Sequence, residues 1–513
     1  MRAGPLAGIL ASSALLILTF PGPDMGWLAP VALVPLLFSV RRLTAGAAFF
    51  YGWLAGFIWF FVSLNWISQT LSRYGGIPFP FNQLAIVILG AILAVYPGVF
   101  TAVVPLVKKA GGPWPAIILP SVWVLTEAAR SRFPAPFPWL ILGSGFWKTS
   151  PVLPLYGLVG VFGVSFLCIL VSVLLLEIVE SVVEGNRRGF LTRVGVLLVL
   201  ATSVFSLGHF SGDEGAQREI TVSVVQGDFP QEIKWEKSMR EETLNTYIGL
   251  SRGADLKGSD LIVWPEAAVP FYYQTEQEFA DRIRDFTRKE KVHLVFGSPA
   301  FGVRGGELVY FNRAYHIGPD GDEEWYDKVR LVPFGEYIPF HRVLGFLEKM
   351  VPGSGEFMPG RMKGPFSTPV PAGTLICFES TFPDLAREQV RRGAEILLNL
   401  TNDAWFGKSW GPHQHLAASA VRAAENGVPL IRAANTGISA IFDRRGHMVK
   451  SLGLFRRGTI TATLETGGKR TFYCRVGDLI VYISAFVIIL AISRKLFGTR
   501  RKPWKIWKDS NSP

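Results

Sequence analysis

Three side chains that could carry out nucleophilic chemistry stand after strand-like runs in the middle of the chain: Glu266, Lys328 and Cys377. A thiol attacks only as the thiolate, so a cysteine nucleophile needs a nearby cation, a base or both. A lysine ammonium about 4 Å from the sulfur would favour the thiolate by roughly 4 kcal/mol at an effective dielectric of about 20. We therefore expect Lys328 to stabilise the thiolate and an oxyanion. We expect Glu266 to accept the thiol proton and return it to a leaving group.

Each of these residues also has an ordinary structural explanation. An isolated buried cysteine is usually a small core residue, and Glu266 could simply begin a short helix after Pro265. Lys328 could be a solvated charge at a strand end. The three cysteines are odd in number and far apart, at Cys168, Cys377 and Cys474, so they predict neither a disulfide framework nor a Cys-x-x-Cys metal site. Residue types alone leave the catalytic role of Cys377 open.

An α/β domain is predicted from about residue 218 to residue 465, where short β-rich runs alternate with amphipathic helices. Polar chemistry in such a fold gathers at strand ends and in the loops after them. The predicted strands are 220–225, 261–264, 292–296, 314–317, 375–378, 396–400 and 430–433, with a hairpin turn at 318–322. The predicted helices are 237–250, 276–291, 382–392 and 412–426.

The rest of the chain predicts a membrane bundle. The protein has 513 residues, of which 49% are hydrophobic, and its mean hydropathy is +0.30. Long charge-poor stretches crowd the first two hundred residues and recur near the C-terminus, and a spanning helix needs about 20 such residues. The candidate spans are 6–20, 27–40, 45–66, 84–107, 114–128, 154–179, 195–207 and 479–493. The first could be a cleaved signal peptide, but the spans that follow it favour a membrane helix.

Basic residues near the span ends predict the orientation, because Lys and Arg in short loops stay in the cytoplasm. With the N-terminus inside, the cytoplasmic loops carry Arg41, Arg42, Lys108, Lys109, Arg187, Arg188 and Arg193, and the C-terminal tail is densely basic. Arg130, Arg132 and Lys148 in an exterior loop oppose this assignment but are outnumbered. The α/β domain should lie outside the cytoplasm. The net charge is +12, but the sequence contains no basic-aromatic strip of the kind that binds nucleic acid. No nucleic-acid partner is therefore expected.

Four segments of the chain resemble those of the apolipoprotein N-acyltransferases, the membrane-bound branch of the nitrilase, or carbon-nitrogen hydrolase, superfamily. They are 263–266 (Val-Trp-Pro-Glu), 327–339 (Asp-Lys-Val-Arg-Leu-Val-Pro-Phe-Gly-Glu-Tyr-Ile-Pro), 376–379 (Ile-Cys-Phe-Glu) and 399–407 (Asn-Leu-Thr-Asn-Asp-Ala-Trp-Phe-Gly). The similarity covers nearly the whole chain, because the spans match that family's plan of seven helices, a catalytic domain and one helix.

The resemblance implies a multi-span α-helical membrane bundle plus an α/β nitrilase-like α-β-β-α sandwich. It divides the chain into a transmembrane domain of about seven helices (1–210), an extracytoplasmic catalytic domain (211–470), and a last transmembrane helix with a basic cytoplasmic tail (471–513). It implies a bacterial inner membrane as the location, with the catalytic domain on the periplasmic side.

The resemblance also assigns roles to residues. A Glu-Lys-Cys triad falls on Glu266, Lys328 and Cys377. Many family members carry tyrosine after the nucleophile, whereas Phe378 here lacks the hydroxyl but keeps an aromatic wall. The other expected supporting or substrate-binding residues are Trp235, Glu336, Glu379, Asn402, Trp405, Trp139 and Gly143.

The implied reaction is a ping-pong transfer that needs no metal or diffusible cofactor. Cys377 takes an acyl chain from the sn-1 ester of a phospholipid as a thioester. The chain then passes to the α-amino group of the N-terminal S-diacylglyceryl cysteine of an apolipoprotein, the last step of lipoprotein maturation. The implied partners are a phospholipid donor, a diacylglyceryl apolipoprotein acceptor and the membrane, and the enzyme is expected to be a monomer.

An apolar, sparsely charged patch beside Lys328 and Glu336 predicts a lipid gate that dips into the outer leaflet. Its members are Phe340, Leu344, Phe346, Leu347 and Met350. Phe79 and Phe81 could line the same entrance or simply belong to an interfacial aromatic belt. His413 and His415 stand two residues apart before a helix, but no third ligand with usual spacing is apparent, which favours a structural role over a metal site.

Two other functions remain possible from the sequence. A membrane-tethered nitrilase-type amidase would use the same triad and give the acyl group to water. A transporter or scaffold would place ionisable residues within its spans, but apart from Glu127 and Glu177 near span ends these are nearly absent.

Overall fold

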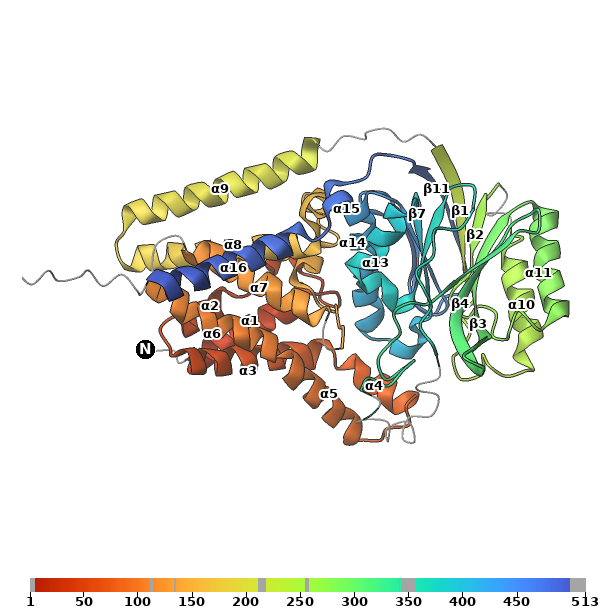
Figure 1. The fold of residues 1–513 in the computed structure, drawn as a ribbon, viewed down its shortest axis with the longest axis horizontal. Helices are drawn as coiled ribbons and strands as arrows, with labels where there is room; N and C mark the ends of the chain where they lie inside the picture. The colour runs from red at the N-terminus through yellow and green to blue at the C-terminus, as the bar shows by residue number, and fades with distance from the viewer. Residues whose placement is uncertain are drawn as a thin grey trace, which may run out of the picture.

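The computed structural model describes residues 5–110, 114–132, 135–210, 218–253, 258–340, 342 and 357–498. Within these residues a helical bundle adjoins a two-sheet sandwich (Figure 1). The layers follow one another from the bundle through α13 and α14 to one sheet, then the second sheet, then α10 and α11.

The bundle is built from apolar helices. Four of its described helical segments are long and apolar enough to cross a membrane: Ala45–Ser63, Phe81–Lys109, Leu153–Val183 and Arg187–Leu207, while Pro5–Thr19 and Leu479–Ser493 are shorter apolar helices. The elements are α1 (Pro5–Thr19), η1 (Gly26–Leu28), α2 (Val34–Val40), α3 (Ala45–Ser63), α4 (Trp66–Arg73), α5 (Phe81–Leu93), α6 (Val95–Ala110), α7 (Trp114–Arg130), η2 (Leu142–Phe146), α8 (Leu153–Val183), α9 (Arg187–Phe210) and α16 (Leu479–Gly498).

The predicted span 114–128 lies in α7, which is not among the described helices long and apolar enough to cross a membrane, and the predicted span 27–40 is not one helix. Residues 27–40 were expected to form one helix, whereas the chain forms the 3-10 turn η1 and the seven-residue helix α2. Pro30 lies between them, and a proline lacks the N–H that a continuous helix needs at that position. The bundle therefore contains a short helix here instead of a span, with Leu36 and Leu37 buried in its core.

The sandwich consists of two sheets. The six-stranded sheet has the order β11-β1-β2-β3-β4-β5, and the five-stranded sheet has the order β10-β9-β8-β7-β6. The strands are β1 (Arg218–Gln226), β2 (Leu261–Val263), β3 (His293–Arg304), β4 (Glu307–Ile317), β5 (Glu323–Asp327), β6 (Ala372–Ile376), β7 (Ile396–Thr401), β8 (Leu430–Ala434), β9 (Ser439–Phe442), β10 (Met448–Leu452) and β11 (Gly458–Thr466). The parallel strands are β1-β2-β3 in the middle of the first sheet and β6-β7-β8 in the second, where β6 forms one edge.

Helices cover both outer faces of the sandwich, which confirms the predicted α-β-β-α fold. They are α10 (Met239–Leu250) and α11 (Gln277–Glu290) on the first sheet, α13 (Pro383–Arg391) and α14 (Gly411–Asn426) on the second, and the short α15 (Phe472–Val476) before α16. Apolar side chains such as Val222 and Leu398 fill the space between the sheets. The α13–α14 layer shares one continuous hydrophobic core with the bundle, which includes Ala420 and Tyr156. Burial on both sides thus fixes α14 between the membrane helices and the sheet.

The predicted strands were in the right places, but their bounds differ; the run 375–378, for example, ends as a strand at Ile376. The hairpin at 318–322 is present, with the Gly318 N–H donating to the Asp322 carbonyl at 2.8 Å. β3 and β4 pair over eleven residues each, well beyond the predicted 292–296 and 314–317. The strands β9, β10 and β11 were not predicted. β10 is a mostly exposed edge strand, so it lacks the apolar run that marks a buried strand.

Candidate active site

Cys377 stands directly after the buried strand β6 and begins the 3-10 helix η5 (Cys377–Thr381). Its φ is +52°, a left-handed conformation that is uncommon for a residue with a side chain and that collects at functional sites. The residue is only 7% exposed. A strand that ends in such a turn presents one side chain at the edge of the sheet, where a substrate can approach.

Lys328 follows β5 and is buried against two carboxylates. Its Nζ lies 2.8 Å from Oε1 of Glu336 and 3.5 Å from Oε1 of Glu266. Burial alone would lower the pKa of Lys328, but Glu336 and Glu266 raise it above its ordinary value, so the amine is a permanent ammonium. Lys328 also interacts electrostatically with Cys377. The structure thus brings the three predicted triad residues and Glu336 into one cluster.

Asn312 on β4 ties this cluster together. Its Nδ2 donates to Oε1 of Glu266 at 2.7 Å and to Oε1 of Glu336 at 2.9 Å. Its backbone carbonyl accepts the N–H of Lys328 at 2.9 Å. Sequence reasoning missed Asn312 because the predicted strand began two residues later, and only the extension of β4 to Glu307 brings it opposite the triad.

The thiol of Cys377 differs from its expected state. Lys328 was expected to hold a thiolate, but burial, followed by the charge of Glu266, raises the pKa of Cys377 well above its ordinary value despite Lys328. Burial is the largest cause of this shift, and the Lys328 ammonium, which also contacts Glu266 and Glu336, opposes it only in part. Burial therefore favours the neutral thiol of Cys377 over the thiolate in the resting protein.

Glu379 joins the lysine loop to the cysteine strand. Its Oε1 accepts the N–H groups of Val329 at 2.6 Å and Arg330 at 3.0 Å, and its Oε2 accepts the N–H of Ile376 at 2.7 Å. The hydroxyl of Tyr326 donates to the same carboxylate at 3.1 Å. Burial raises the pKa of Glu379 to about 7, although the three amide donors oppose this shift. The residue fixes the loop after Lys328 relative to the strand before Cys377.

Lys234 is a charged residue next to the base that sequence reasoning missed. It is fully buried, and its Nζ donates to the backbone carbonyl of Glu266 at 3.3 Å. Burial lowers the pKa of Lys234 to about 7, and the charge of Glu266 only partly opposes this. The neighbouring Trp235, which was predicted, is 46% exposed. Only burial distinguishes Lys234 from an ordinary surface lysine, and the sequence carries no local signal of it.

The aromatic wall is formed jointly by the two parts of the chain. The rings of Phe378 and Trp139 are 6.2 Å apart with planes 22° from parallel, and Phe382 packs edge-on against Phe378 at 5.0 Å. Trp139 precedes η2 of the bundle and is 5% exposed. Phe378, which stands where many family members carry tyrosine, therefore makes an apolar contact between the sandwich and the bundle.

Three other predicted residues lie in the surroundings of the cluster. Asn402 is buried, and its Nδ2 donates to Oε1 of Gln231 at 2.7 Å. Trp405 is 40% exposed and packs against Tyr74 of the bundle, with ring centroids 4.8 Å apart. Gly143 lies in η2, and its N–H donates to Oγ of Ser165 at 2.8 Å. None of their side-chain contacts among the described residues reaches the triad.

The predicted lipid gate lies mostly outside the described residues, namely at Leu344, Phe346, Leu347 and Met350. Phe340 is described, with 58% of its surface exposed and a φ of +52°. Phe79, before α5, and Phe81, the first residue of α5, are 79% and 61% exposed. These rings are the exposed aromatic groups of the predicted entrance.

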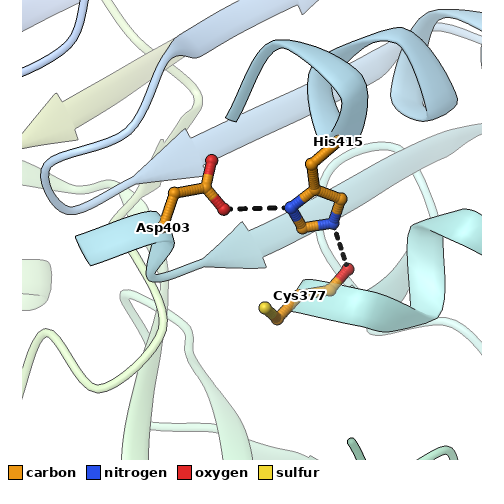
Figure 2. A group of neighbouring side chains, drawn as sticks. All are labelled: Cys377, Asp403 and His415. Atoms are coloured by element: carbon orange, nitrogen blue, oxygen red, sulfur yellow. Dashed lines mark hydrogen bonds and ion pairs between the residues drawn. The ribbon is translucent and has the colours of Figure 1, made fainter. Parts of the chain in front are cut away.

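His415, for which the sequence favoured a structural role, and Asp403, to which it assigned none, both lie behind Cys377 (Figure 2). Their ligand atoms and the sulfur are within 4.8 Å of one another, a spacing at which metal ions are sometimes held. However, both oxygens of Asp403 are occupied, Oδ1 by His415 at 2.9 Å and Oδ2 by the Arg432 guanidinium at 2.6 Å. The cation beside this carboxylate is therefore an arginine of the chain itself.

Comparisons with known proteins give a consistent result. A family described as "Carbon-nitrogen hydrolase" matches residues 221–470, and one described as "Apolipoprotein N-acyltransferase N-terminal domain" matches residues 12–174. The chain is 38% identical to the apolipoprotein N-acyltransferase of Geobacter metallireducens, over 94% of each chain. It is 31% identical to the protein of the same name from Nitrosomonas europaea, over 96% of this chain and 98% of that one.

Proposed function

The chain belongs to the apolipoprotein N-acyltransferase family, and we propose that its Glu266–Lys328–Cys377 cluster is the catalytic triad. The enzyme is an acyltransferase of lipoprotein biosynthesis that moves an acyl chain from a phospholipid to the amino terminus of an apolipoprotein. The observation that carries the residue assignment is the contact of the Lys328 ammonium with Glu266 beside a cysteine held at positive φ.

In the first half of the reaction, Glu266 accepts the proton of the Cys377 thiol as the sulfur attacks the carbonyl carbon of the sn-1 ester. The oxyanion of the tetrahedral intermediate is stabilised by the ammonium of Lys328, which needs no reorganisation because Glu336 and Glu266 already hold it. The bond from carbon to the glycerol oxygen then breaks. Glu266 gives its proton to that oxygen, a lysophospholipid leaves, and the acyl chain remains on Cys377 as a thioester.

In the second half, the acceptor enters as a free amine after its ammonium has lost one proton to water. The amine nitrogen attacks the thioester carbonyl, and Lys328 again stabilises the oxyanion. Glu266 takes one proton from the attacking nitrogen, the carbon–sulfur bond breaks, and Glu266 returns the proton to the sulfur. The products are an amide on the apolipoprotein and the neutral thiol of Cys377, which is the resting state that burial favours.

Transfer to an amine rather than to water is supported by the surroundings of the cysteine. Cys377 is 7% exposed, and Phe378 and Trp139 form an apolar wall beside it. A buried apolar site admits few water molecules and accepts lipid-linked substrates from the adjoining bundle. The match of the N-terminal domain to the family likewise favours acyl transfer over a membrane-tethered amidase.

The orientation in the membrane is supported by ion pairs at one end of the bundle. Arg41 and Lys108 both contact Glu180, at 3.2 Å and 2.6 Å, and Arg193 contacts Glu177 at 2.8 Å. These basic residues lie at the ends of α2 and α6 and near the start of α9, in segments that the positive-inside rule assigns to the cytoplasm. The enzyme is then a multi-pass inner-membrane protein with residues 1–210 and 471–513 in the membrane and tail, and residues 211–470 on the periplasmic side.

A monomer suffices for this chemistry, because a single chain supplies the triad, Glu336, Asn312 and both sides of the aromatic wall. The acyl chain is carried by Cys377 itself, so the scheme uses no cofactor.

A trapping experiment tests the proposal. Purified enzyme in mixed micelles is incubated with a phospholipid labelled in its sn-1 chain, and the adduct is located by peptide mass spectrometry. We expect a hydroxylamine-labile acyl group on Cys377 that a diacylated lipopeptide discharges and water scarcely does. Cys377→Ala should form no adduct, whereas Cys474→Ser, a matched change at another buried cysteine, should form it normally. A label on any other residue, or hydrolysis without the lipopeptide, would contradict the assignment.

A further inference from the structure

A fully buried polar network stands behind Cys377. His415 on α14 lies with its Nδ1 2.9 Å from Oδ1 of Asp403, and Arg432 on β8 places its Nη2 2.6 Å from Oδ2 of Asp403. The same guanidinium nitrogen is 3.1 Å from Nδ1 of His415. All three residues are buried, with less than 2% of their surface exposed. A buried ionic group is costly unless its geometry is satisfied, so a satisfied network at this place needs a reason.

The network ends on the backbone of the nucleophile rather than on its sulfur. Nε2 of His415 is 3.0 Å from the carbonyl oxygen of Cys377, and Figure 2 shows the sulfur extending in another direction from that oxygen. A carbonyl can only accept, so this contact is a hydrogen bond in the tautomer that carries a proton on Nε2, and the Ser380 hydroxyl lies 3.0 Å from the same nitrogen. His415 is therefore not placed to remove the thiol proton.

The same carbonyl receives two further donors. Nδ2 of Asn399 reaches it at 3.2 Å and the hydroxyl of Ser380 at 3.1 Å, in addition to His415. Three donors converge on one backbone oxygen at the single residue of η5 whose φ is positive. Because a peptide unit is planar, fixing this oxygen also fixes the N–H of Phe378, which points the opposite way. In nucleophile turns the N–H after the nucleophile is a common oxyanion donor.

The network also touches the membrane bundle. Gln414, which precedes His415 on α14, has its Oε1 held by the indole N–H groups of Trp139 at 2.7 Å and Trp66 at 3.1 Å. Its Nε2 donates to the carbonyl of Ser63 at 3.1 Å. The ring of Trp139 also lies 5.6 Å from that of His415. The bundle thus fixes the start of α14 at the turn that carries His415.

We propose that His415, with Asp403 and Arg432 behind it, is a positioning residue for the acylation step. It holds the Cys377 carbonyl so that the sulfur and the Phe378 N–H present a fixed nucleophile and oxyanion donor to the ester. Gln414, through its hydrogen bonds to the bundle, holds this turn in a fixed place relative to the bundle. The inference rests on the proposed function, because it requires Cys377 to be the nucleophile.

Two substitutions of His415 separate positioning from other roles. Glutamine places an amide nitrogen close to where Nε2 lies, so His415→Gln keeps a donor for the Cys377 carbonyl. Asparagine places its amide near Nδ1, so His415→Asn keeps a partner for Asp403 but loses the carbonyl contact. We expect single-turnover acylation of Cys377 to slow at least about tenfold more in His415→Asn than in His415→Gln, with KM for the phospholipid unchanged. Both variants should melt at similar temperatures.

Ser380→Ala keeps the proposal testable if both histidine variants fail to fold. It removes one small donor from the Cys377 carbonyl, and it should slow acylation without changing the KM for phospholipid. Thr381→Val is its matched control, because the Thr381 hydroxyl is equally buried but donates to the carbonyl of Phe378 at 2.7 Å. Acylation at the wild-type rate in Ser380→Ala and His415→Asn would overturn the inference. So would equal losses in His415→Gln and His415→Asn, because they would point to a chemical or purely structural role.

The acylation of the wild-type enzyme distinguishes failure of this inference from failure of the proposed function. If wild type forms a thioester on Cys377 while the variants acylate equally fast, only the positioning role is wrong. If wild type forms no thioester, the assignment of Cys377 as nucleophile is wrong, and the positioning role falls with it.

Discussion

The side-chain amide of Asn312 donates a 2.7 Å hydrogen bond to Oε1 of Glu266, the proposed base. The second N–H of the same amide donates to Glu336, the carboxylate that holds Lys328. One neutral residue thus links the proposed base, Glu266, to the carboxylate that holds Lys328, the proposed oxyanion-stabilising residue. It binds both without adding charge, so the single ammonium of Lys328 stays shared between two carboxylates.

Asn312→Leu should slow acylation of Cys377 by about 10- to 100-fold, because a hydrogen bond to a charged group contributes about 1.5–3 kcal/mol. The measurement is the single-turnover rate with labelled phospholipid in the wild type and the variant. Asn245→Leu, a change of the same type on the exterior of the sandwich, serves as the control. An unchanged rate in Asn312→Leu would show that Glu266 and Lys328 keep their places without the amide.

Alkylation of Cys377 by iodoacetamide should be slow at neutral pH and should rise continuously as the pH rises above 8. The reason is that burial and Glu266 raise the pKa of this thiol, and only the thiolate reacts. Peptide mass spectrometry measures the rate at each pH. A plateau already reached below pH 8 would mean that the resting enzyme holds a thiolate after all, as the sequence alone suggested.

Lys234→Met should change how stability depends on pH. Burial lowers the pKa of Lys234 to about 7 in the folded protein, whereas in the unfolded chain it is about 10.5. Between these values the unfolded chain binds a proton that the folded protein does not, so the stability of wild type falls as the pH falls from about 10.5 to 7 and then levels off. The variant should lose this slope and melt at a higher temperature near pH 7.

Thermal unfolding in detergent between pH 6 and 10 measures this difference. Lys237→Met, which alters an exposed lysine three residues further on, should keep the wild-type slope. Parallel curves for wild type and Lys234→Met would show that Lys234 is solvated in the folded enzyme.

Phe378→Tyr should be tolerated, with acylation within about threefold of wild type, since that is a change of less than about 1 kcal/mol. The ring already packs against Trp139 and Phe382, and a hydroxyl at its edge preserves those contacts. Phe378→Ala removes the wall and should destabilise the enzyme by roughly 3–5 kcal/mol. Melting temperature and acylation rate together distinguish the two. If Phe378→Tyr were as damaged as Phe378→Ala, the wall would require an apolar edge.

The sequence by itself determined the class of fold and the residue types of the site. Apolar runs of spanning length predicted the bundle, and alternating strands and helices predicted the α/β domain. Both are visible in the sequence because hydrophobic periodicity depends only on residues that are close together in the chain. The motifs around Glu266, Lys328 and Cys377 predicted the side chains that the structure brings into one cluster. Glu336 and Glu379 followed from the same motifs, and their contacts with Lys328 and with the loop after it give each a physical role.

Only the tertiary structure decided the protonation and the positioning of that chemistry. The charge of a thiol or a lysine depends on burial and on neighbours from distant strands, as the opposite shifts in the pKa of Cys377 and Lys234 demonstrate. Asn312 stands 46 residues from Glu266, and His415 stands 38 residues from Cys377. No local pattern records such contacts, because packing of the two sheets and of α14 against the bundle creates them.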